Sequence, residues 1–382
     1  MFEKFRNWLA NNRSFLFSRY TKDALTTQEP ERTLIELPPE IRQKLVDGIE
    51  NLPSSSGDRQ AIIEKLDEVF ELWQNKSDTN NSLVILSSPV VAVSRILTSA
   101  IGEWAEQKQI PVRLLPLKAR PEVANTIKSK LKQYLEKEFV EEAAGSHKPE
   151  IVVLPNLSWC FLRTWDGLEG IEYLQSRLSD GFKDRFWIIG GGQVGWEYLN
   201  SVSNIEAYGT EVFTLPELTS EQLQQWLEPI IKDLNITFDD PGIDRKIFEG
   251  DKDDKTHYFE RLTDISKGVS TVALQVFLKS IRYEELEEEN AIIAEFPKLP
   301  DLPELDSADQ YLLYSLLLHG DMTISALAES LGDLTSEVQA RVQVLRKQGI
   351  VEQRQKVLKI NPIYYPKIKQ RLASNNFVIN KQ

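Results

Sequence analysis

Residues 82–94 read SLVILSSPVVAVS, a short apolar run that passes quickly into the start of a helix. The run LVIL lies between Ser82 and Ser87, which is typical of a strand buried on both faces. The segment after it, 93–107, spaces its apolar residues as an amphipathic helix does. A buried strand followed at once by such a helix is the first half of a βαβ unit and predicts a parallel sheet.

The same alternation continues on the C-terminal side of this stretch. Four further strands are predicted at 110–117, 150–156, 185–192 and 208–218. Helices are predicted at 93–107, 125–145, 167–182 and 220–234. Because parallel strands need crossover connections, this order predicts an α/β fold whose sheet is covered by helices on both faces.

Composition changes suggest how the rest of the chain is divided. After residue 240 the strand pattern ends, EELEEEN and FPKLPDLPELD look like a linker, and three helical segments then precede the alternating pair IVEQRQKVLKI. Three helices and a hairpin predict a winged helix. The predicted units are an N-terminal helical region at 1–80, an α/β core at 81–235, a helical lid at 236–285, a linker at 286–306, and a winged helix with a basic C-terminal tail at 307–382.

The composition excludes several classes of protein. Cys160 is the single cysteine, which excludes an internal disulfide framework and a thiolate zinc cluster, and the three histidines lie far apart. No metal site is therefore predicted. No uninterrupted apolar run is long enough for a transmembrane helix, and charges interrupt the first twenty residues where a secretory signal needs an apolar region. We expect a cytoplasmic protein, with a peripheral position at the membrane as an alternative.

The order of elements resembles that of AAA+ or STAND-type P-loop ATPases, with a C-terminal winged helix as in the origin-recognition branch. A P-loop follows the pattern G-x-x-x-x-G-K-[ST], in which backbone N–H groups and the lysine hold phosphates. At the equivalent junction of this chain, Ser87 and Ala92 replace the glycines, Val93 replaces the lysine, and only Ser94 matches. The resemblance thus implies a P-loop NTPase-like core that has lost phosphate binding.

The other chemical positions of that family are also replaced. Pro155 and Asn156 stand where the third strand should end in two carboxylates, and Thr271 stands where the lid often carries an arginine. The fourth strand, which should end in a polar sensor residue, ends in Gly190. The resemblance therefore implies a catalytically inactive pseudo-ATPase, without catalytic residues or cofactor, that acts as a scaffold or protein-interaction module. Its predicted partner is a protein, either a second copy of the chain or an active ATPase relative.

Glycines in the fourth strand support an alternative hypothesis. Gly190, Gly192 and Gly195 have the G-x-G-x-x-G spacing of an NAD- or FAD-binding turn, and Glu217 would be the acid that holds the ribose. Against an oxidoreductase, the segment after the glycines has weak apolar periodicity, and Glu217 lies further along than the usual spacing. The competing interpretation is that these glycines stand where bulkier residues would not fit.

Two further partners are alternatives. The net charge is −13, yet residues 341–382 hold ten Lys or Arg and one acid, Glu352. The winged helix is therefore a candidate for binding DNA or an acidic protein surface through Arg341, Arg346, Lys347, Arg354, Lys356 and Lys359. An N-terminal helix is a candidate for contact with a membrane surface or a partner through Phe2, Phe5, Trp8, Leu9, Phe15 and Leu16.

Overall fold

The computed structural model contains the five parallel strands that the sequence predicts. The structure describes residues 37–75, 80–136, 150–179, 185–208, 210–238, 254–284 and 291–379. The strands are β1 (Ser82–Ser87), β2 (Val112–Leu114), β3 (Glu150–Leu154), β4 (Arg185–Gly192) and β5 (Thr210–Thr214). Their order across the sheet is β2-β3-β4-β1-β5, so β1 lies between β4 and β5 and its end is enclosed by neighbours.

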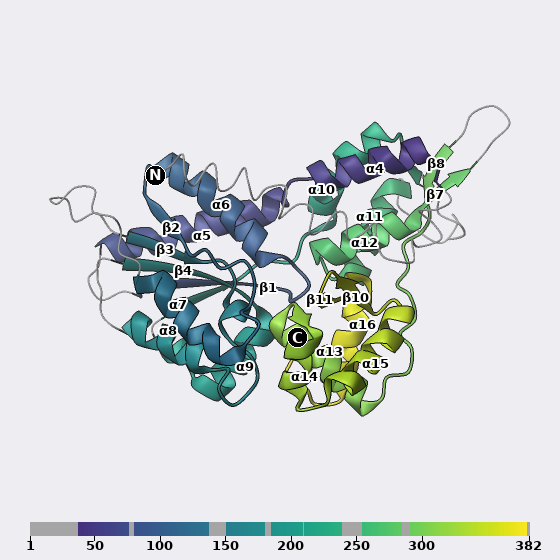
Figure 1. Cartoon of the computed structure of the whole chain (residues 1–382). Helices are drawn as coiled ribbons and strands as arrows, with labels where there is room; N and C mark the ends of the chain where they lie inside the picture. The colour runs from purple at the N-terminus through teal and green to yellow at the C-terminus, as the bar shows by residue number, and fades with distance from the viewer. Residues whose placement is uncertain are drawn as a thin grey trace.

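Helices cover both faces of this sheet, as Figure 1 shows. One face packs against α5 (Ser56–Asn75) and α6 (Val93–Lys108), and the other against α7 (Ile127–Glu136), α8 (Glu169–Ser179) and α9 (Gln193–Ser203). Side chains alternate along β1: Leu83 and Ile85 join the first layer, whereas Val84 and Leu86 join the second. This two-sided burial explains why the strands read as continuous apolar runs.

The lid follows the core through α10 (Ser220–Asp233), which begins with a reciprocal capping box. Thr219 Oγ1 accepts from the Gln222 N–H at 3.3 Å, and Gln222 Oε1 accepts from the Thr219 N–H at 3.0 Å. The lid, residues 254–284 and 291–294, contains α11 (Asp254–Ser266) and α12 (Ser270–Ser280). Helix α4 (Pro39–Asn51) packs against α10 on the same side of the molecule (Figure 1).

The expectation that strands end after residue 240 is wrong. β7 (Ile281–Glu284) and β8 (Ala291–Ala294) form an antiparallel pair, and β6 (Thr237–Phe238) joins the other edge of β8. The apolar run AIIA lies in the predicted linker, but it is a strand because it pairs with residues distant in sequence. Strands of two to four residues are too short to give a clear periodic signal.

The C-terminal module, residues 307–379, has the element order predicted for the winged helix. It contains α13 (Ser307–His319), β9 (Met322–Thr323), α14 (Ile324–Leu331), α15 (Thr335–Lys347), β10 (Val351–Arg354), β11 (Val357–Ile360), η4 (Pro362–Tyr364) and α16 (Tyr365–Ser374). Its sheet order is β10-β11-β9, with antiparallel pairs. The module lies beside the core and below the lid in Figure 1.

Three local predictions concern the segment after the glycines, the end of the fourth strand and the N-terminal helix. The segment after the glycines is the helix α9, although its apolar periodicity is weak, because Val194, Trp196 and Leu199 are buried between core and module. β4 spans Arg185–Gly192, as the predicted range 185–192 has it, so Gly190 lies within the strand and not at its end. The predicted N-terminal helix with Phe2, Phe5, Trp8, Leu9, Phe15 and Leu16 lies outside the described residues.

Candidate functional site

The loop between β1 and α6, where the resemblance predicted a replaced phosphate-binding loop, uses amides internally. The Val91 N–H donates to Ser88 O at 2.9 Å, the Val93 N–H donates to Val91 O at 2.9 Å, and the Arg95 N–H donates to Ala92 O at 3.0 Å. All of residues 87–94 are described, and none has a positive φ. Anion-binding nests need successive amides in alternating right- and left-handed conformations, so this loop does not form one.

The side chains of the loop also lack phosphate chemistry. Val93 is 3% exposed and begins α6 with its side chain in the interior. The Ser87 hydroxyl donates to Ser88 O at 3.2 Å. Ser94, the second residue of α6, has a carbonyl oxygen that accepts from Thr98 Oγ1 at 2.7 Å. Ser87, Ala92, Val93 and Ser94 thus lie in one short segment, residues 87–94, that contains no Lys or Arg.

The carboxyl end of β3, where the resemblance implied replaced carboxylates, carries a helix cap. Asn156 Oδ1 accepts from the Ser158 N–H at 3.0 Å and so caps the short helix η2 (Leu157–Cys160). Pro155 O would lie 2.5 Å from a Cβ on Gly190 of the neighbouring strand. These residues fix the backbone at the sheet edge. Thr271, on α12, has a buried hydroxyl with no hydrogen-bond partner in the described part of the chain.

Two of the three motif glycines are explained by close packing. A Cβ on Gly195 would meet Leu318 O of the C-terminal module at 2.6 Å, whereas a Cβ on Gly192 would meet nothing closer than 3.6 Å. The backbone at Gly190 and Gly195 is therefore approached by protein, where a dinucleotide site would leave it open to a pyrophosphate. Glu217, the proposed ribose ligand, lies on an exposed loop after β5.

A buried arginine joins the core to the C-terminal module. Arg120 donates to Ser158 O at 2.8 and 3.2 Å and to Phe161 O at 2.9 Å in the core. It also donates to His319 O at 3.1 Å and Asp321 O at 2.9 Å in the module. Burial lowers the pKa of Arg120 to about 10, so the guanidinium remains charged at neutral pH. The positive charge of Arg120 is stabilised by hydrogen bonds to backbone carbonyl groups in and after η2 and α13.

Arg163 forms a second contact between the core and the C-terminal module, next to that of Arg120. The Arg163 N–H donates to His319 Nε2 at 3.4 Å, and Arg163 Nη2 donates to Ser330 O at 3.2 Å. His319 is fully buried, and burial, with the nearby guanidinium groups of Arg120 and Arg163, lowers the pKa of its imidazole well below the ordinary value. Sequence patterns gave no sign of this junction, because an isolated arginine in a loop has no periodicity and its acceptors are backbone atoms.

Two cavities of different volume border the loop between β1 and α6. A cavity of about 100 Å³ faces residues 89–95 and is closed by Leu316, Gly320 and Pro362 of the module. A cleft of about 810 Å³ lies at the end of β1, between the core, the lid and α16. Ligand sites usually occupy several hundred Å³, so the larger cleft has the volume for a small molecule.

The basic residues of the module do not form one open surface. Arg341 forms ion pairs with Asp306 at 2.9 Å and Asp309 at 3.2 Å. Arg354 is half-buried, and burial lowers its pKa to about 10. Lys359 pairs across the hairpin with Glu352 in register and lines the 100 Å³ cavity. Arg346 and Lys347 lie in the last turn of α15, and Lys356 is exposed at the hairpin turn.

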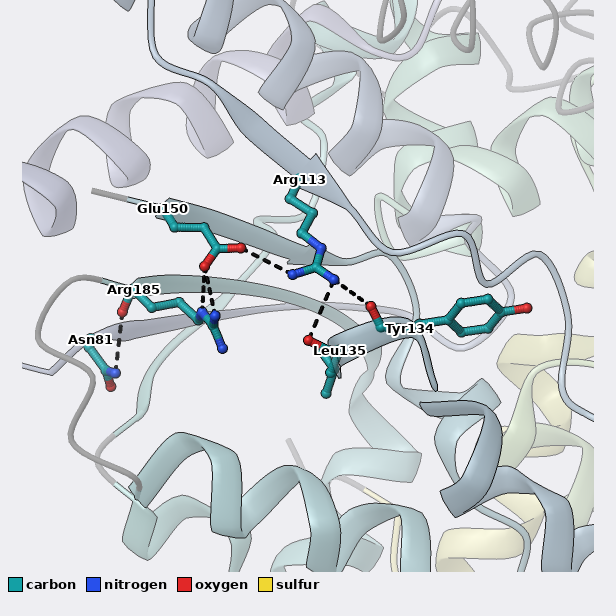
Figure 2. Close-up of polar contacts among 6 residues, drawn as sticks. All are labelled: Asn81, Arg113, Tyr134, Leu135, Glu150 and Arg185. Carbon is teal, nitrogen blue, oxygen red and sulfur yellow. Dashed lines mark hydrogen bonds and ion pairs between the residues drawn. The ribbon is translucent and has the colours of Figure 1, made fainter. Parts of the chain in front are cut away.

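An ion cluster lies at the opposite, amino edge of the sheet, shown in Figure 2. The Glu150 carboxylate accepts from Arg185 at 2.7 and 2.8 Å and from Arg113 at 3.2 Å. Arg113 also donates to Tyr134 O and Leu135 O in the last turn of α7 (Figure 2). Ligands of open α/β sheets bind outside the carboxyl ends of the strands, so this cluster serves to fix strand register.

Membrane-spanning helices and metal-binding clusters are absent from the described residues. The described helices include none with the length and apolar character that crossing a bilayer requires. Within the described ranges, no three or more His, Cys, Asp or Glu side chains are grouped so as to hold a metal ion. Burial raises the pKa of the Cys160 thiol to about 12, which makes it a poor nucleophile.

Comparison with known proteins gives distant structural likenesses only. No protein-family model matches the chain, and no curated protein matches it. It is similar to the ORC2 protein of Aeropyrum pernix, at 13% identity over 87% of this chain and 97% of that chain, with a TM-score of 0.41. It is similar to Cdc6p from Pyrobaculum aerophilum, at 13% identity over 85% and 96%, with a TM-score of 0.37. It is also similar to Drosophila ORC bound to DNA, at 11% identity over 93% and 99%, with a TM-score of 0.35.

The strand order and register of the chain itself define the fold class: an α/β protein with a five-stranded parallel sheet and further helical units.

Proposed function

We propose that this chain is an AAA+-like protein that does not hydrolyse ATP and acts as a scaffold or protein-interaction module. The observation that carries the proposal is the loop between β1 and α6. Its amides at Val91 and Val93 are bonded within the loop, and the side chain in the lysine position is a buried valine. A phosphate placed there would meet neither a nest nor a lysine at the start of the helix.

The junction between core and C-terminal module supports the scaffold role. Arg120 and Arg163 tie the two units together through backbone carbonyl groups from both sides. Gly195 allows α9 to approach Leu318 O closely. A core held in this way presents its surfaces in a fixed arrangement, which suits a protein that positions partners.

An exposed tryptophan supports the interaction role. Trp165 is 97% exposed, at the tip of a turn in which the Leu162 N–H donates to Gly167 O at 3.0 Å and the Thr164 N–H donates to Leu162 O at 2.8 Å. Its neighbour Leu162 is buried, so the turn is anchored. Tryptophan is enriched among residues that dominate protein interfaces, and a rigid turn lowers the entropy cost of binding.

The interaction role is tested by capturing the intact protein under native conditions and identifying what remains bound. The proposal expects a stoichiometric protein partner, or a second copy, that is lost in Trp165→Ala. Leu334→Ala is the matched control, because Leu334 is also exposed but lies on the C-terminal module. Failure to retain any protein, together with ATP turnover above background, would contradict the proposal.

A further inference from the structure

The 810 Å³ cleft contains a buried acid that the fold does not use. Asp58 lies in the first turn of α5, is 5% exposed, and lines both this cleft and a smaller adjoining cavity of about 80 Å³. No N–H or O–H of the described residues donates to its carboxylate. Burial alone raises its pKa to about 6, so the group is mostly ionised at neutral pH. A largely buried acid with a perturbed pKa at the wall of a cleft often marks a binding site.

Four cations line the cleft and the smaller cavity; three of them are bound to other acceptors, and the fourth, Lys369, lies on α16 at the cleft. Arg95 lines the smaller cavity with Asp58, but its guanidinium donates to Leu52 O at 2.9 Å. At the cleft itself, Lys267 pairs with Asp264 at 3.2 Å and Lys367 pairs with Asp301 at 2.9 Å. Each of these interactions uses an acceptor other than Asp58. The positive end of helix α5 favours an anion in its first turn, where Asp58 lies.

The walls around the acid are mainly apolar and come from three units. They include Val91 of the core, Leu215 after β5, Ile265 and Val269 of the lid, and Leu299 before the C-terminal module. Three acids and three lysines line the cleft, so its formal charges cancel. A ligand that presents a basic nitrogen to Asp58 and an apolar body to these walls would match this part of the lining.

We propose that this cleft binds a small organic cation, an amine or amidine with an apolar body, whose charged nitrogen pairs with Asp58. The pairing would supply the hydrogen bonds that the carboxylate lacks and would bridge the core, the lid and α16. This inference is independent of the proposed loss of ATP hydrolysis, because a cation and a nucleoside triphosphate require opposite charges in the site.

The probe is benzamidine, a planar amidinium with an apolar ring, added to the full chain at millimolar concentrations. Benzamide is the neutral control of similar shape. Binding is followed by the rise in melting temperature and by calorimetry. We expect a rise with benzamidine that benzamide does not give, and at least a tenfold weaker affinity in Asp58→Asn. Asp264→Asn, which changes a more exposed acid on the rim of the same cleft, should bind as the wild type does.

Three results would overturn the proposal. These are an absence of any melting-temperature rise with benzamidine, an equal rise with benzamide, and an unchanged benzamidine affinity in Asp58→Asn. Because Asn has nearly the shape of Asp and removes a buried charge, the variant is expected to fold. Its own melting curve without ligand verifies this. A separate titration with ATP and Mg²⁺ reports on the proposed function, so the two ideas can fail independently.

Discussion

Replacing Arg120 by alanine should loosen the contact between the core and the C-terminal module. The side chain donates to four carbonyl oxygens, two in the core and two in the module. Hydrogen bonds from a charged donor contribute about 1.5–3 kcal/mol each, and water can re-enter to satisfy part of what is lost. A net loss of about 3–5 kcal/mol in the free energy of unfolding is therefore expected.

The measurement is urea unfolding followed by two probes, together with hydrogen exchange at the end of α13 and at η2. The wild type should unfold in a transition that couples core and module, whereas Arg120→Ala should separate them and exchange faster at both ends of the contact. Lys130→Ala is the control, because Lys130 is exposed and lies near the same loop. A change below about 1 kcal/mol, with exchange like that of the control, would refute the role given to Arg120.

Three further predictions concern single positions. Gly195→Ala should lower the free energy of unfolding by about 1–3 kcal/mol, because its Cβ would lie 2.6 Å from Leu318 O. Gly192→Ala should change the free energy of unfolding by less than about 0.5 kcal/mol. Equal effects of the two substitutions in urea unfolding would contradict the packing explanation. Asp58 has a folded pKa of about 6, above its ordinary value of 3.8, so the folded state holds the proton more tightly than the unfolded state does. The free energy of unfolding of the wild type, relative to that of Asp58→Asn, should therefore fall by up to about 3 kcal/mol as the pH rises from about 4 to about 6. If melting curves show the same difference between the two proteins across that range, the burial of this acid is contradicted. In a gel-shift assay at low salt the wild type should give no DNA complex, because Arg341 forms ion pairs with Asp306 and Asp309. A complex that forms with the wild type and is abolished by Lys347→Glu would support the DNA-binding alternative.

The main sheet could be predicted because its strands are long enough to show their character. Buried parallel strands read as apolar runs, and each lies between helices with a clear apolar face, as in β1 and α6. The short strands β7 and β8 were missed because four residues fit several periodicities, and their pairing depends on distant contacts. The helix α9 was underestimated because it is buried against two units, so its apolar residues do not follow one face.

The candidate site was predictable in part. The positions of Val93 and Asn156 follow from the ends of the strands, since a junction between a strand and a helix can be located from sequence. The internal hydrogen bonds of the loop could not be read in this way, because they depend on backbone conformation. Arg120 and Asp58 were also missed: each is a lone charged residue in the sequence, and its role comes from burial.

We propose that the loop between β1 and α6 does not bind phosphate. The most direct test is a calorimetric titration of the full chain with ATP in the presence of Mg²⁺. The account predicts no binding heat above that of dilution, because the loop offers neither free amides in a nest nor a lysine. Saturable binding with micromolar affinity would contradict it.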